Sequence, residues 1–237
     1  PIAEYDPFEC IKTNIIGAMN VVDCAIDCNV EKVIALSTDK ASSPANLYGA
    51  TKLVSDKVFV SGNNYSGAHG TKFSIVRYGN VMGSRGSVIP FFLRQRNEGV
   101  LHITDKRMTR FMIDLKQGVE LVNFALSDCV GGEIYVKKIP SMKVINIAST
   151  LGPKCEQHLI GIRPGEKIHE EMISLEDSFS TYEYKDYFKI LPTLNNWHLD
   201  PNRIKDGIKV PTGFSYTSDA NSEWMTPDDL RKWVAEY

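Results

Sequence analysis

Apolar side chains recur at helical spacing near the start of the chain. Between Asp6 and about Asn29 they are Phe8, Ile11, Ile15, Ile16, Ala18, Val21, Val22 and Ala25. This spacing predicts a long helix with one packed face, and Asp6 and Pro7 suit its first turn. The nearly continuous apolar run from Lys32 to Ser37 then predicts a buried parallel strand.

The same two kinds of element follow again downstream. Apolar positions on one face predict a helix from about Tyr48 to Gly62, and the segment from Lys72 to Tyr78 predicts the next strand. Helix, strand, helix and strand at these lengths indicate right-handed βαβ units and a parallel sheet. Because ligands bind beyond the carboxyl ends of such strands, the polar clusters STDK and GNVMGSRGS are expected at the binding edge.

The pattern becomes irregular beyond about Gly86, which indicates a smaller second domain. Thr226, followed by a proline and two acids, predicts a closing helix. Other short elements are expected as helices near residues 88–98 and 114–127 and as strands near residues 100–103 and 133–136.

We therefore expect an α/β fold: the C-terminal part of a Rossmann-like doubly wound parallel sheet plus a smaller α/β substrate-binding domain. Residues 1–86 would form the second half of the nucleotide-binding domain and carry the catalytic residues, and residues 87–237 would mainly bind substrate. A glycine-rich turn normally opens such a sheet, but no GxGxxG or GxxGxxG motif precedes Tyr48. The first, glycine-rich half of the cofactor fold is therefore expected to be missing from this chain.

Composition narrows the class of protein. The chain has 237 residues, of which 43% are hydrophobic, so it can bury an ordinary core. Its formal net charge of -2 gives no basic excess, so nucleic acid is not expected as a partner. No apolar run approaches about 20 residues, so we expect no membrane span and a soluble, cytoplasmic protein. The five cysteines lack CxxC spacing and the histidines are scattered, so no metal site is expected.

Tyr48 and Lys52 are the first candidates for chemistry. They are four positions apart and hence on one face of the predicted helix, where an ammonium can stabilise a tyrosinate. Such a phenol can act as a base near neutral pH. A lone YxxxK pair is more often an ordinary half-buried tyrosine and a surface lysine. Ser37 and Thr38 favour chemistry here, because hydroxyls at the preceding strand end can bind the same substrate oxygen.

Four sequence blocks resemble a known family. In chain order they are STDKASSPANLYGATK, RYGNVMGSRGSVIPFF, ITDKRMTRFMI and IRPGEKIHEEMI. Together they resemble the inverting, 5-epimerising UDP-N-acetylglucosamine 4,6-dehydratases of the extended short-chain dehydrogenase family, over nearly the whole chain. The resemblance implies a hydro-lyase with tightly bound, recycled NADP that converts UDP-N-acetylglucosamine to a UDP-4-keto-6-deoxy-L-hexose. It also implies a place in pseudaminic acid or other surface-glycan synthesis, and a homo-oligomer built partly on the first long helix.

The resemblance assigns roles to the strand-end residues. Tyr48 would take the proton of the sugar 4-hydroxyl while hydride passes from C4 to NADP. Thr38 would orient that hydroxyl, and Lys52 would lower the pKa of Tyr48 and hold the ribose. Asp39 and Lys40, which in isolation would be a solvated pair in a turn, would remove the C5 proton and assist loss of the 6-hydroxyl as water. Which of these two acts at each atom stays open, and the related dehydratases that retain the C5 configuration carry Asp-Glu there.

Further residues are implied as ligand contacts. The cofactor would contact Asn14, Ser37, Tyr48, Lys52, Val81, Met82, Gly83, Ser84 and Arg85. The sugar nucleotide would contact Asn80, Val88, Thr104, Arg107, Arg110, Arg163 and Glu166. The arginines suit a diphosphate because a guanidinium pairs bidentately with phosphate oxygens, although each alone is more often a surface salt-bridge residue. Glu166 could accept from ribose hydroxyls or cap a following helix, and Asn14 could be a helix-face residue without a role.

Other interpretations remain open. A relative could oxidise and epimerise at C4, or dehydrate without inversion, and the chemistry at Lys40 separates these. A chain without the glycine-rich turn could instead be a non-catalytic sugar-nucleotide-binding or assembly module. The missing half could reflect truncation, a split protein completed by another polypeptide, or a degenerate relative. We favour truncation, because every downstream catalytic residue type suits its role.

Overall fold

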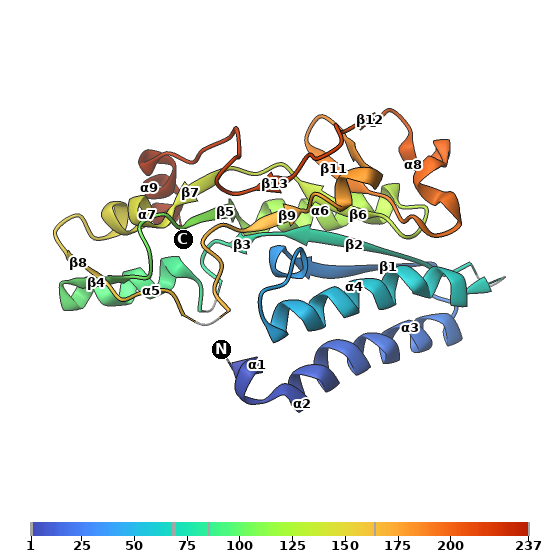
Figure 1. The fold of residues 1–237 in the computed structure, drawn as a ribbon, viewed down its shortest axis with the longest axis horizontal. Helices are drawn as coiled ribbons and strands as arrows, with labels where there is room; N and C mark the ends of the chain where they lie inside the picture. Colours follow the sequence, from blue (N-terminus) through green and yellow to red (C-terminus); the bar gives the residue numbers. More distant parts are fainter. Residues whose placement is uncertain (1, 68–69, 85, 164, 237) are drawn as a thin grey trace. The chain divides into compact units, whose positions relative to one another are not determined.

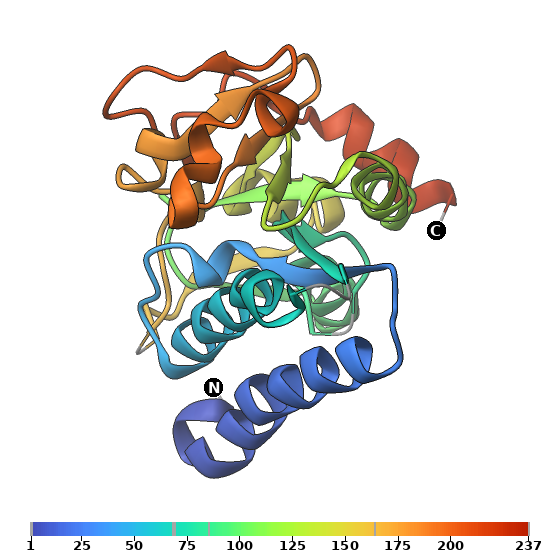
Figure 2. The same ribbon diagram turned by 90° about the vertical axis from the view of Figure 1, so that its right-hand side faces the viewer.

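The structure is a computed structural model, and it describes residues 2–67, 70–84, 86–163 and 165–236. The chain forms two compact units, each assembled from separate stretches of sequence (Figures 1 and 2). The first unit combines residues 1–78, 119–138 and 171–215. The second combines residues 79–118, 139–170 and 216–237.

A six-stranded sheet forms the frame of the first unit. Its strands are, in spatial order, β1 (Lys32–Thr38), β2 (Lys72–Tyr78), β6 (Ile134–Lys137), β11 (Tyr187–Ile190), β10 (Thr181–Glu183) and β12 (Ile208–Lys209). β1, β2 and β6 are parallel, and the other three strands are antiparallel to their neighbours. β1 and β2 pair from Lys32↔Lys72 to Thr38↔Tyr78. Both strands therefore end at the same edge of the sheet, as the sequence predicts.

Helices from the N-terminal part of the chain cover one face of this sheet. They are α1 (Ile2–Tyr5), α2 (Pro7–Ile11), a π-helical turn (Lys12–Ile16), α3 (Gly17–Asp27) and α4 (Leu47–Tyr65). Asp6 caps α2 by accepting a backbone N–H at 3.3 Å, and Pro7 is the first helical residue. Figures 1 and 2 show α3 running beside α4, and Val22, Phe59 and Phe73 join α3, α4 and β2 in one core.

The opposite face of the sheet is covered by α6 (Leu115–Asp128). Leu121 and Ala125 of this helix pack against Val76 of β2 and Tyr135 of β6. Ile75 belongs to the core under α4, whereas Val76 belongs to the core under α6. Successive side chains of β2 therefore pack against helices on opposite faces of the sheet. Helices on both faces of a parallel sheet confirm the doubly wound α/β class.

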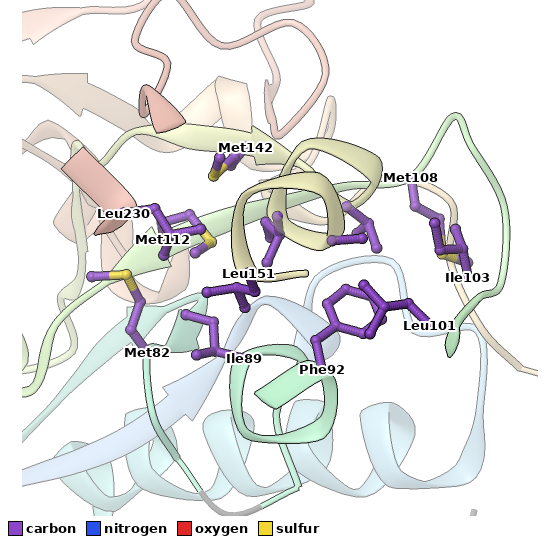
Figure 3. Close-up of a cluster of buried hydrophobic side chains, with 13 residues drawn as sticks. Met82, Ile89, Phe92, Leu101, Ile103, Met108, Met112, Met142, Leu151 and Leu230 are labelled. Atoms are coloured by element: carbon purple, nitrogen blue, oxygen red, sulfur yellow. The ribbon is translucent and has the colours of Figure 1, made fainter. Parts of the chain in front are cut away.

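Small sheets and helices build the second unit. β3 (Asn80–Val81), β5 (Thr109–Ile113) and β7 (Ser141–Lys143) form one sheet, and β4 (Val100–Ile103) pairs in parallel with β8 (Glu156–Leu159). The helices are α5 (Val88–Gln95), α7 (Val144–Leu151) and α9 (Pro227–Glu236). Ile89, Phe92, Leu101 and Met112 belong to its buried core (Figure 3). Thr226 caps α9 by accepting the N–H of residue 229 at 3.2 Å, as predicted.

Short elements complete both units. The first unit also contains η2 (Asp39–Ala41), β9 (Glu171–Ile173), η5 (Asp177–Ser180), η6 (Leu194–Leu199) and α8 (Pro201–Ile204), and the second contains η4 (Arg96–Glu98) and β13 (Tyr216–Thr217).

In the described part of the chain, no helix is long and apolar enough to cross a membrane. The same residues contain no group of three or more His, Cys, Asp or Glu side chains that could hold a metal ion. All five cysteines are free.

The two units differ from the linear division at residue 86 that the sequence predicts. Residues 119–138 and 171–215 lie far beyond that position, yet they supply four of the six strands of the main sheet. β11 pairs with β6, which is distant in sequence, while β10 and β12 have only three and two residues and so show no clear periodicity. For this reason the sequence pattern predicts neither the strands β10, β11 and β12 nor the return of the chain to the first unit.

Candidate active site

The carboxyl end of β1 delivers three of the predicted catalytic residues. Thr38 ends the strand and caps the 3-10 helix of Asp39–Ala41, accepting the Lys40 N–H at 3.4 Å. The Thr38 hydroxyl donates to Asp39 Oδ1 at 2.8 Å, and Lys40 Nζ donates to the same oxygen at 3.0 Å. One carboxylate oxygen therefore holds a hydroxyl and an ammonium together.

Asp39 is fully buried although it carries a carboxylate. Its exposed fraction is 0%, whereas the Lys40 side chain keeps 33%. Asp39 Oδ2 has no hydrogen-bond partner among the described residues. A buried polar atom without a partner costs free energy. Asp39 Oδ2 is therefore an atom that would gain from accepting a substrate hydroxyl or a proton.

A glycine lets helix α4 approach this turn closely. Asn46 caps α4 by accepting the Gly49 N–H at 2.8 Å, which fixes the start of the helix just before Tyr48. A Cβ atom at position 49 would overlap the carbonyl oxygen of Lys40. Glycine therefore permits an approach that places the first turn of α4 against the Asp39–Lys40 segment.

The charges of Asp39 and Lys40 both affect the pKa of Tyr48. Its exposed fraction is 40%. Burial raises the pKa of the Tyr48 phenol, Lys40 lowers it, and Asp39 and Cys10 raise it. Lys40 is therefore the cation that favours the tyrosinate in this arrangement. Electrostatic interactions therefore connect Asp39 and Lys40 to the predicted base.

Lys52 points to the edge of the sheet. Its Nζ donates to the carbonyl of Leu36 at 3.0 Å, and Leu36 lies on β1, the edge strand, with an exposed fraction of 52%. Burial raises the pKa of Tyr48 overall and Lys40 opposes this rise, so the lowering of this pKa by Lys52 stays a prediction. An ammonium at a strand edge is suited to bind hydroxyl groups, so a role of Lys52 toward a ribose stays a prediction.

Asn14 is linked to the backbone of Tyr48 through the side chain of Thr51. It sits in the π-helical turn of the first helix, and such turns occur often at functional sites. Asn14 Nδ2 donates to Thr51 Oγ1 at 3.0 Å, and Thr51 donates to the Tyr48 carbonyl at 2.8 Å. The structure therefore brings Asn14 to the site, and its contact with a cofactor stays a prediction.

Sequence analysis missed two residues of this site, Gly49 and Asp56. Asp56 is buried on α4 and accepts the Ser37 hydroxyl at 2.7 Å. Ser37 is itself buried, and its predicted contact with the cofactor stays a prediction. Two signals could have found them: a glycine directly after Tyr48, and an acid four positions after Lys52 on the same helix face.

In the second unit, four predicted contact residues line one small hollow. It is lined by Asn80, Val81, Met82, Ser87, Val88, Ile89 and Met112. Asn80 Oδ1 is buried and has no hydrogen-bond partner in the described ranges. The hollow has no room even for a water molecule, so the contacts of these four residues with a ligand stay predictions.

The segment after β3 contains the remaining predicted cofactor contacts. Gly83 has a φ of 77°, a conformation that favours glycine, and the Ser84 N–H donates to the Val81 carbonyl at 3.1 Å. Arg85 lies outside the described residues. The contacts of Val81, Met82, Gly83 and Ser84 with a cofactor stay predictions.

Arg107 is exposed and already holds a carboxylate. Its Nε and Nη2 donate to the two oxygens of Asp105 at 3.0 and 2.8 Å. Hydrogen bonds from Arg107 lower the pKa of the Asp105 carboxyl to about 2. A diphosphate would have to compete with this bidentate pair. Thr104 lies on the same loop, half-buried, directly after β4.

Arg110 is buried and binds backbone groups of its own unit. It donates to the carbonyl oxygens of Thr109 at 2.7 Å, Ile168 at 3.1 Å and Lys167 at 3.3 Å. Its Nε also lies 3.5 Å from the buried carboxylate of Glu170. These contacts make Arg110 a tie between β5 and the segment after residue 165.

Arg163 is the predicted phosphate ligand with an exposed side chain and no carboxylate within ion-pair distance in the described residues. Its N–H donates to Glu166 Oε2 at 3.3 Å, and the Glu166 N–H donates to the Arg163 carbonyl at 3.1 Å. Glu166 Oε1 lies 3.9 Å from Arg110 Nη2. Residues 165–173 form no helix, so Glu166 caps its own turn rather than a following helix.

The donors at the edge of β1 fit one end of a dinucleotide. The Tyr48 phenol and the Lys52 ammonium can both donate to ribose hydroxyls, and they share one face of α4. The described residues before β1 include no glycine-rich turn to bind phosphates. The residues present therefore fit the nicotinamide ribose, and the phosphates would need further donors.

The doubly wound sheet, with Thr38 at the end of its edge strand and Tyr48 and Lys52 on helix α4, defines an enzyme domain of the short-chain dehydrogenase type. Sequence comparison gives the family. The chain belongs to the Polysaccharide biosynthesis protein family, which matches residues 1–192.

Two kinds of curated relative are similar to the chain. It is 52% identical to the UDP-N-acetylglucosamine 4,6-dehydratase (inverting) of Campylobacter jejuni over 237 residues, which are 97% of this chain and 71% of that protein. It is 40% identical to the UDP-glucose 4-epimerase of Rickettsia canadensis over 195 residues, 80% of this chain and 57% of that protein. The first similarity confirms the resemblance that the four sequence blocks indicate.

Solved structures share the fold. Pen from Bacillus thuringiensis superposes with a TM-score of 0.88 at 35% identity, over 99% of this chain and 72% of that one. The dTDP-glucose 4,6-dehydratase DesIV from Streptomyces venezuelae, solved with NAD and TYD, gives a TM-score of 0.60 at 21% identity over 70% of this chain and 58% of that one. The second likeness supports the fold alone.

Proposed function

We propose that the chain carries the active-site part of an inverting UDP-N-acetylglucosamine 4,6-dehydratase. The observation that supports this most directly is the polar cluster of Thr38, Asp39, Lys40 and Tyr48. Asp39 is fully buried there, and one of its oxygens has no hydrogen-bond partner among the residues that the structure describes. An Asp-Lys pair beside a tyrosine provides the acid and base that water loss requires. The 52% identity to the Campylobacter jejuni dehydratase supports the same reaction.

Tyr48 begins the reaction as a base. The phenolate removes the proton of the sugar 4-hydroxyl, and the Thr38 hydroxyl holds that oxygen. Lys40 favours the phenolate because it lowers the pKa of Tyr48 against the effect of burial. A bound nicotinamide cofactor, NADP by the family resemblance, supplies the hydride acceptor for C4 and the hydride donor for C6. Lys52 and Tyr48 would hold its ribose.

Asp39 and Lys40 share the proton transfers that follow. The C4 ketone acidifies the C5 proton, so one of the pair removes it while the other protonates the departing 6-hydroxyl, which leaves as water. Lys40 Nζ lies 3.0 Å from Asp39 Oδ1, close enough for the two groups to exchange a proton between turnovers. Protonation of C5 from the opposite face then inverts that centre.

Residues of the second unit would bind the sugar nucleotide. Arg163 is the best-placed partner for the diphosphate, because its side chain is exposed and without a carboxylate partner in the described residues. Asn80 and Val88 would contact the sugar. Thr104 and Glu166 stay candidates for polar contacts with the nucleotide.

The setting of the enzyme follows from the family resemblance. We propose a cytoplasmic homo-oligomer that serves surface-glycan synthesis of the pseudaminic acid type. The first helix supports association, because Tyr5, Phe8 and Met19 expose 89%, 76% and 49% of their surface.

A nucleotide-sugar epimerase is the second candidate, and the 40% identity to the Rickettsia canadensis enzyme favours it. Mass spectrometry of UDP-N-acetylglucosamine incubated with the protein and NADP separates the two reactions, because only dehydration lowers the mass by one water. The assay is run on this chain and on the chain preceded by a glycine-rich nucleotide-binding half. Water loss in either supports the dehydratase, an unchanged mass with epimerisation supports the epimerase, and no reaction in either favours a binding module.

A further inference from the structure

One polar cluster interrupts the apolar contact between α4 and the sheet. The side chains that β1 and β2 direct toward α3 and α4 include Val33, Ala35, Phe73 and Ile75, all of which belong to one hydrophobic core. Alternation along the strands places Ser37 and Arg77 in the same two rows. The last position of each row before the active-site edge is therefore polar.

Asp56 of α4 meets these two polar residues. Ser37 and Arg77 are register partners on β1 and β2. The Ser37 hydroxyl donates to Asp56 Oδ2 at 2.7 Å, and Arg77 Nη2 donates to the same oxygen at 3.2 Å. All three side chains are buried, with exposed fractions of 5% or less. We call Ser37, Asp56 and Arg77 the anchor.

Arg77 fixes the anchor to a third segment of the first unit. Its Nη1 donates to the carbonyl of Met172 at 2.9 Å and to Asp177 Oδ2 at 3.4 Å. Burial raises the pKa of the Asp56 carboxyl, and Arg77 and then Ser37 lower it. Removing one member of such a buried group leaves the others without compensation, so the anchor has one favourable arrangement.

The anchor lies on the same helix face as the catalytic residues. Tyr48, Lys52 and Asp56 follow one another at intervals of four positions along α4. Lys52 Nζ binds the Leu36 carbonyl, and Asp56 binds the side chain of the next residue, Ser37. Two consecutive residues of β1 are thus tied to two consecutive turns of α4, immediately before Thr38.

Apolar contacts alone allow a helix to rotate or slide by small amounts, whereas directional hydrogen bonds do not. We infer that the Ser37–Asp56–Arg77 anchor sets the rotation of α4 on the sheet and thereby positions the Tyr48 phenol beside Thr38 and Lys40. Asp56 and Arg77 are positioning residues, because they touch neither the sugar nor the reacting atoms. The consequence for turnover rests on the proposed function, but the positioning itself does not.

The chain offers a matched control for this idea. Ser74 on β2 also donates to a buried carboxylate, Glu133 Oε2, at 2.7 Å. It belongs to the row that faces away from α4. Ser37→Ala and Ser74→Ala therefore remove the same kind of hydrogen bond from the same unit, without changing any charge.

The test uses the chain labelled with carbon-13 at the ζ carbon of tyrosine, with the Tyr48 resonance assigned by its loss in Tyr48→Phe. Ser37→Ala is expected to shift the Tyr48 resonance at least several times further than Ser74→Ala does. Asp56→Ala removes the acceptor of the same bond, so the double variant of Ser37→Ala and Asp56→Ala should shift the resonance no further than Asp56→Ala alone. Equal shifts in the two alanine variants, no shift in Ser37→Ala, or additive shifts in the double variant would each overturn the anchor.

The measurement needs neither substrate nor cofactor. A wild-type protein without dehydratase activity would therefore defeat the proposed function and leave the anchor standing on the resonance shifts. In a preparation that turns over, Ser37→Ala should lower kcat about tenfold or more and leave KM within about twofold, because displacement of a reacting group mainly affects the chemical step. An unchanged kcat would overturn the catalytic consequence of the anchor.

Discussion

Charged groups are paired differently in two regions of the molecule: the Tyr48 cluster (Thr38, Asp39, Lys40 and Tyr48) and the arginine region of the second unit (Arg107 and Arg110). In the cluster, Asp39 and Lys40 contact each other and act on Tyr48, while Asp39 Oδ2 keeps no partner in the described residues. In the arginine region, Arg107 and Arg110 are engaged by groups of the same unit. Arg107 and Arg110 are thus occupied by groups of their own unit, whereas Asp39 Oδ2 can still accept a hydrogen bond.

The largest effect is expected at Lys40. Lys40→Ala should lower water loss from UDP-N-acetylglucosamine by roughly 10²–10⁴-fold, because it removes one of the two proton-transfer groups. The protein should stay folded, with a lowered unfolding midpoint because the buried Asp39 carboxylate loses its cation. Nuclear magnetic resonance of the product measures the first quantity and circular dichroism the second.

Lys12→Ala is the control, because Lys12 pairs with Glu9 on an exposed helix surface. Full dehydratase activity in Lys40→Ala would remove this residue from the mechanism.

Gly49→Ala tests the close approach of α4 to the turn. The added Cβ would overlap the Lys40 carbonyl, so α4 or the turn must shift. We expect turnover to fall about 10²-fold and the free energy of unfolding to fall by about 1–3 kcal/mol. Gly118→Ala, in α6 with nothing within 4 Å of the new Cβ, should keep or slightly raise stability. Equal behaviour of the two variants would contradict the account.

Arg110→Met tests the structural use of the arginine region. The variant removes the cation 3.5 Å from the buried Glu170 carboxylate, together with three hydrogen bonds to carbonyl oxygens. Chemical denaturation should show a loss of about 3 kcal/mol in the free energy of unfolding. Arg107→Met, at an exposed side chain, should leave the midpoint within error. A reversed order would mean that Arg110 is not a tie within the second unit.

Arg163→Ala tests which arginine binds phosphate. Loss of a charged hydrogen-bond donor should weaken UDP binding roughly tenfold in calorimetry. Arg107→Ala should weaken it less, because Arg107 already holds Asp105. A larger effect of Arg107→Ala would mean that the diphosphate displaces Asp105 and binds Arg107.

The smallest effect concerns the pH response of Asp105. Arg107 holds the pKa of this carboxyl at about 2, below its ordinary value of 3.8. The contact is therefore fully formed above pH 3.8 and is lost as the pH falls toward about 2. In Arg107→Ala, a carbon-13 titration should show the Asp105 pKa returning toward 3.8. An unchanged midpoint would mean that another group sets this pKa.

Much of the first unit follows from local sequence patterns. The first helix and α4 were predicted from their apolar periodicity, and β1 and β2 from short apolar segments. Asp6 with Pro7 gave the start of the first helix. The Thr38, Asp39, Lys40 and Tyr48 cluster follows from the position of these residues at a strand end and a helix start. The π-helical turn around Asn14 does not, because the apolar spacing of the helix continues through it.

What the sequence could not predict depends on long-range contacts. The close approach at Gly49 is made against the Lys40 backbone, and Arg110 binds carbonyl oxygens some sixty positions away. In the sequence, an arginine that binds phosphate looks the same as a buried arginine that links two segments of the fold. Only the partners of Arg107 and Arg110 in the folded unit separate the two uses.

The most direct test of the central claim is a nuclear magnetic resonance time course with UDP-N-acetylglucosamine and NADP in deuterated water, using the chain with a nucleotide-binding half. The expected product is a 4-keto-6-deoxy sugar nucleotide that carries deuterium at C5 with inverted configuration, because Asp39 and Lys40 would exchange the C5 proton with solvent. A product that retains the C5 configuration, or a C4 epimer without water loss, would contradict it.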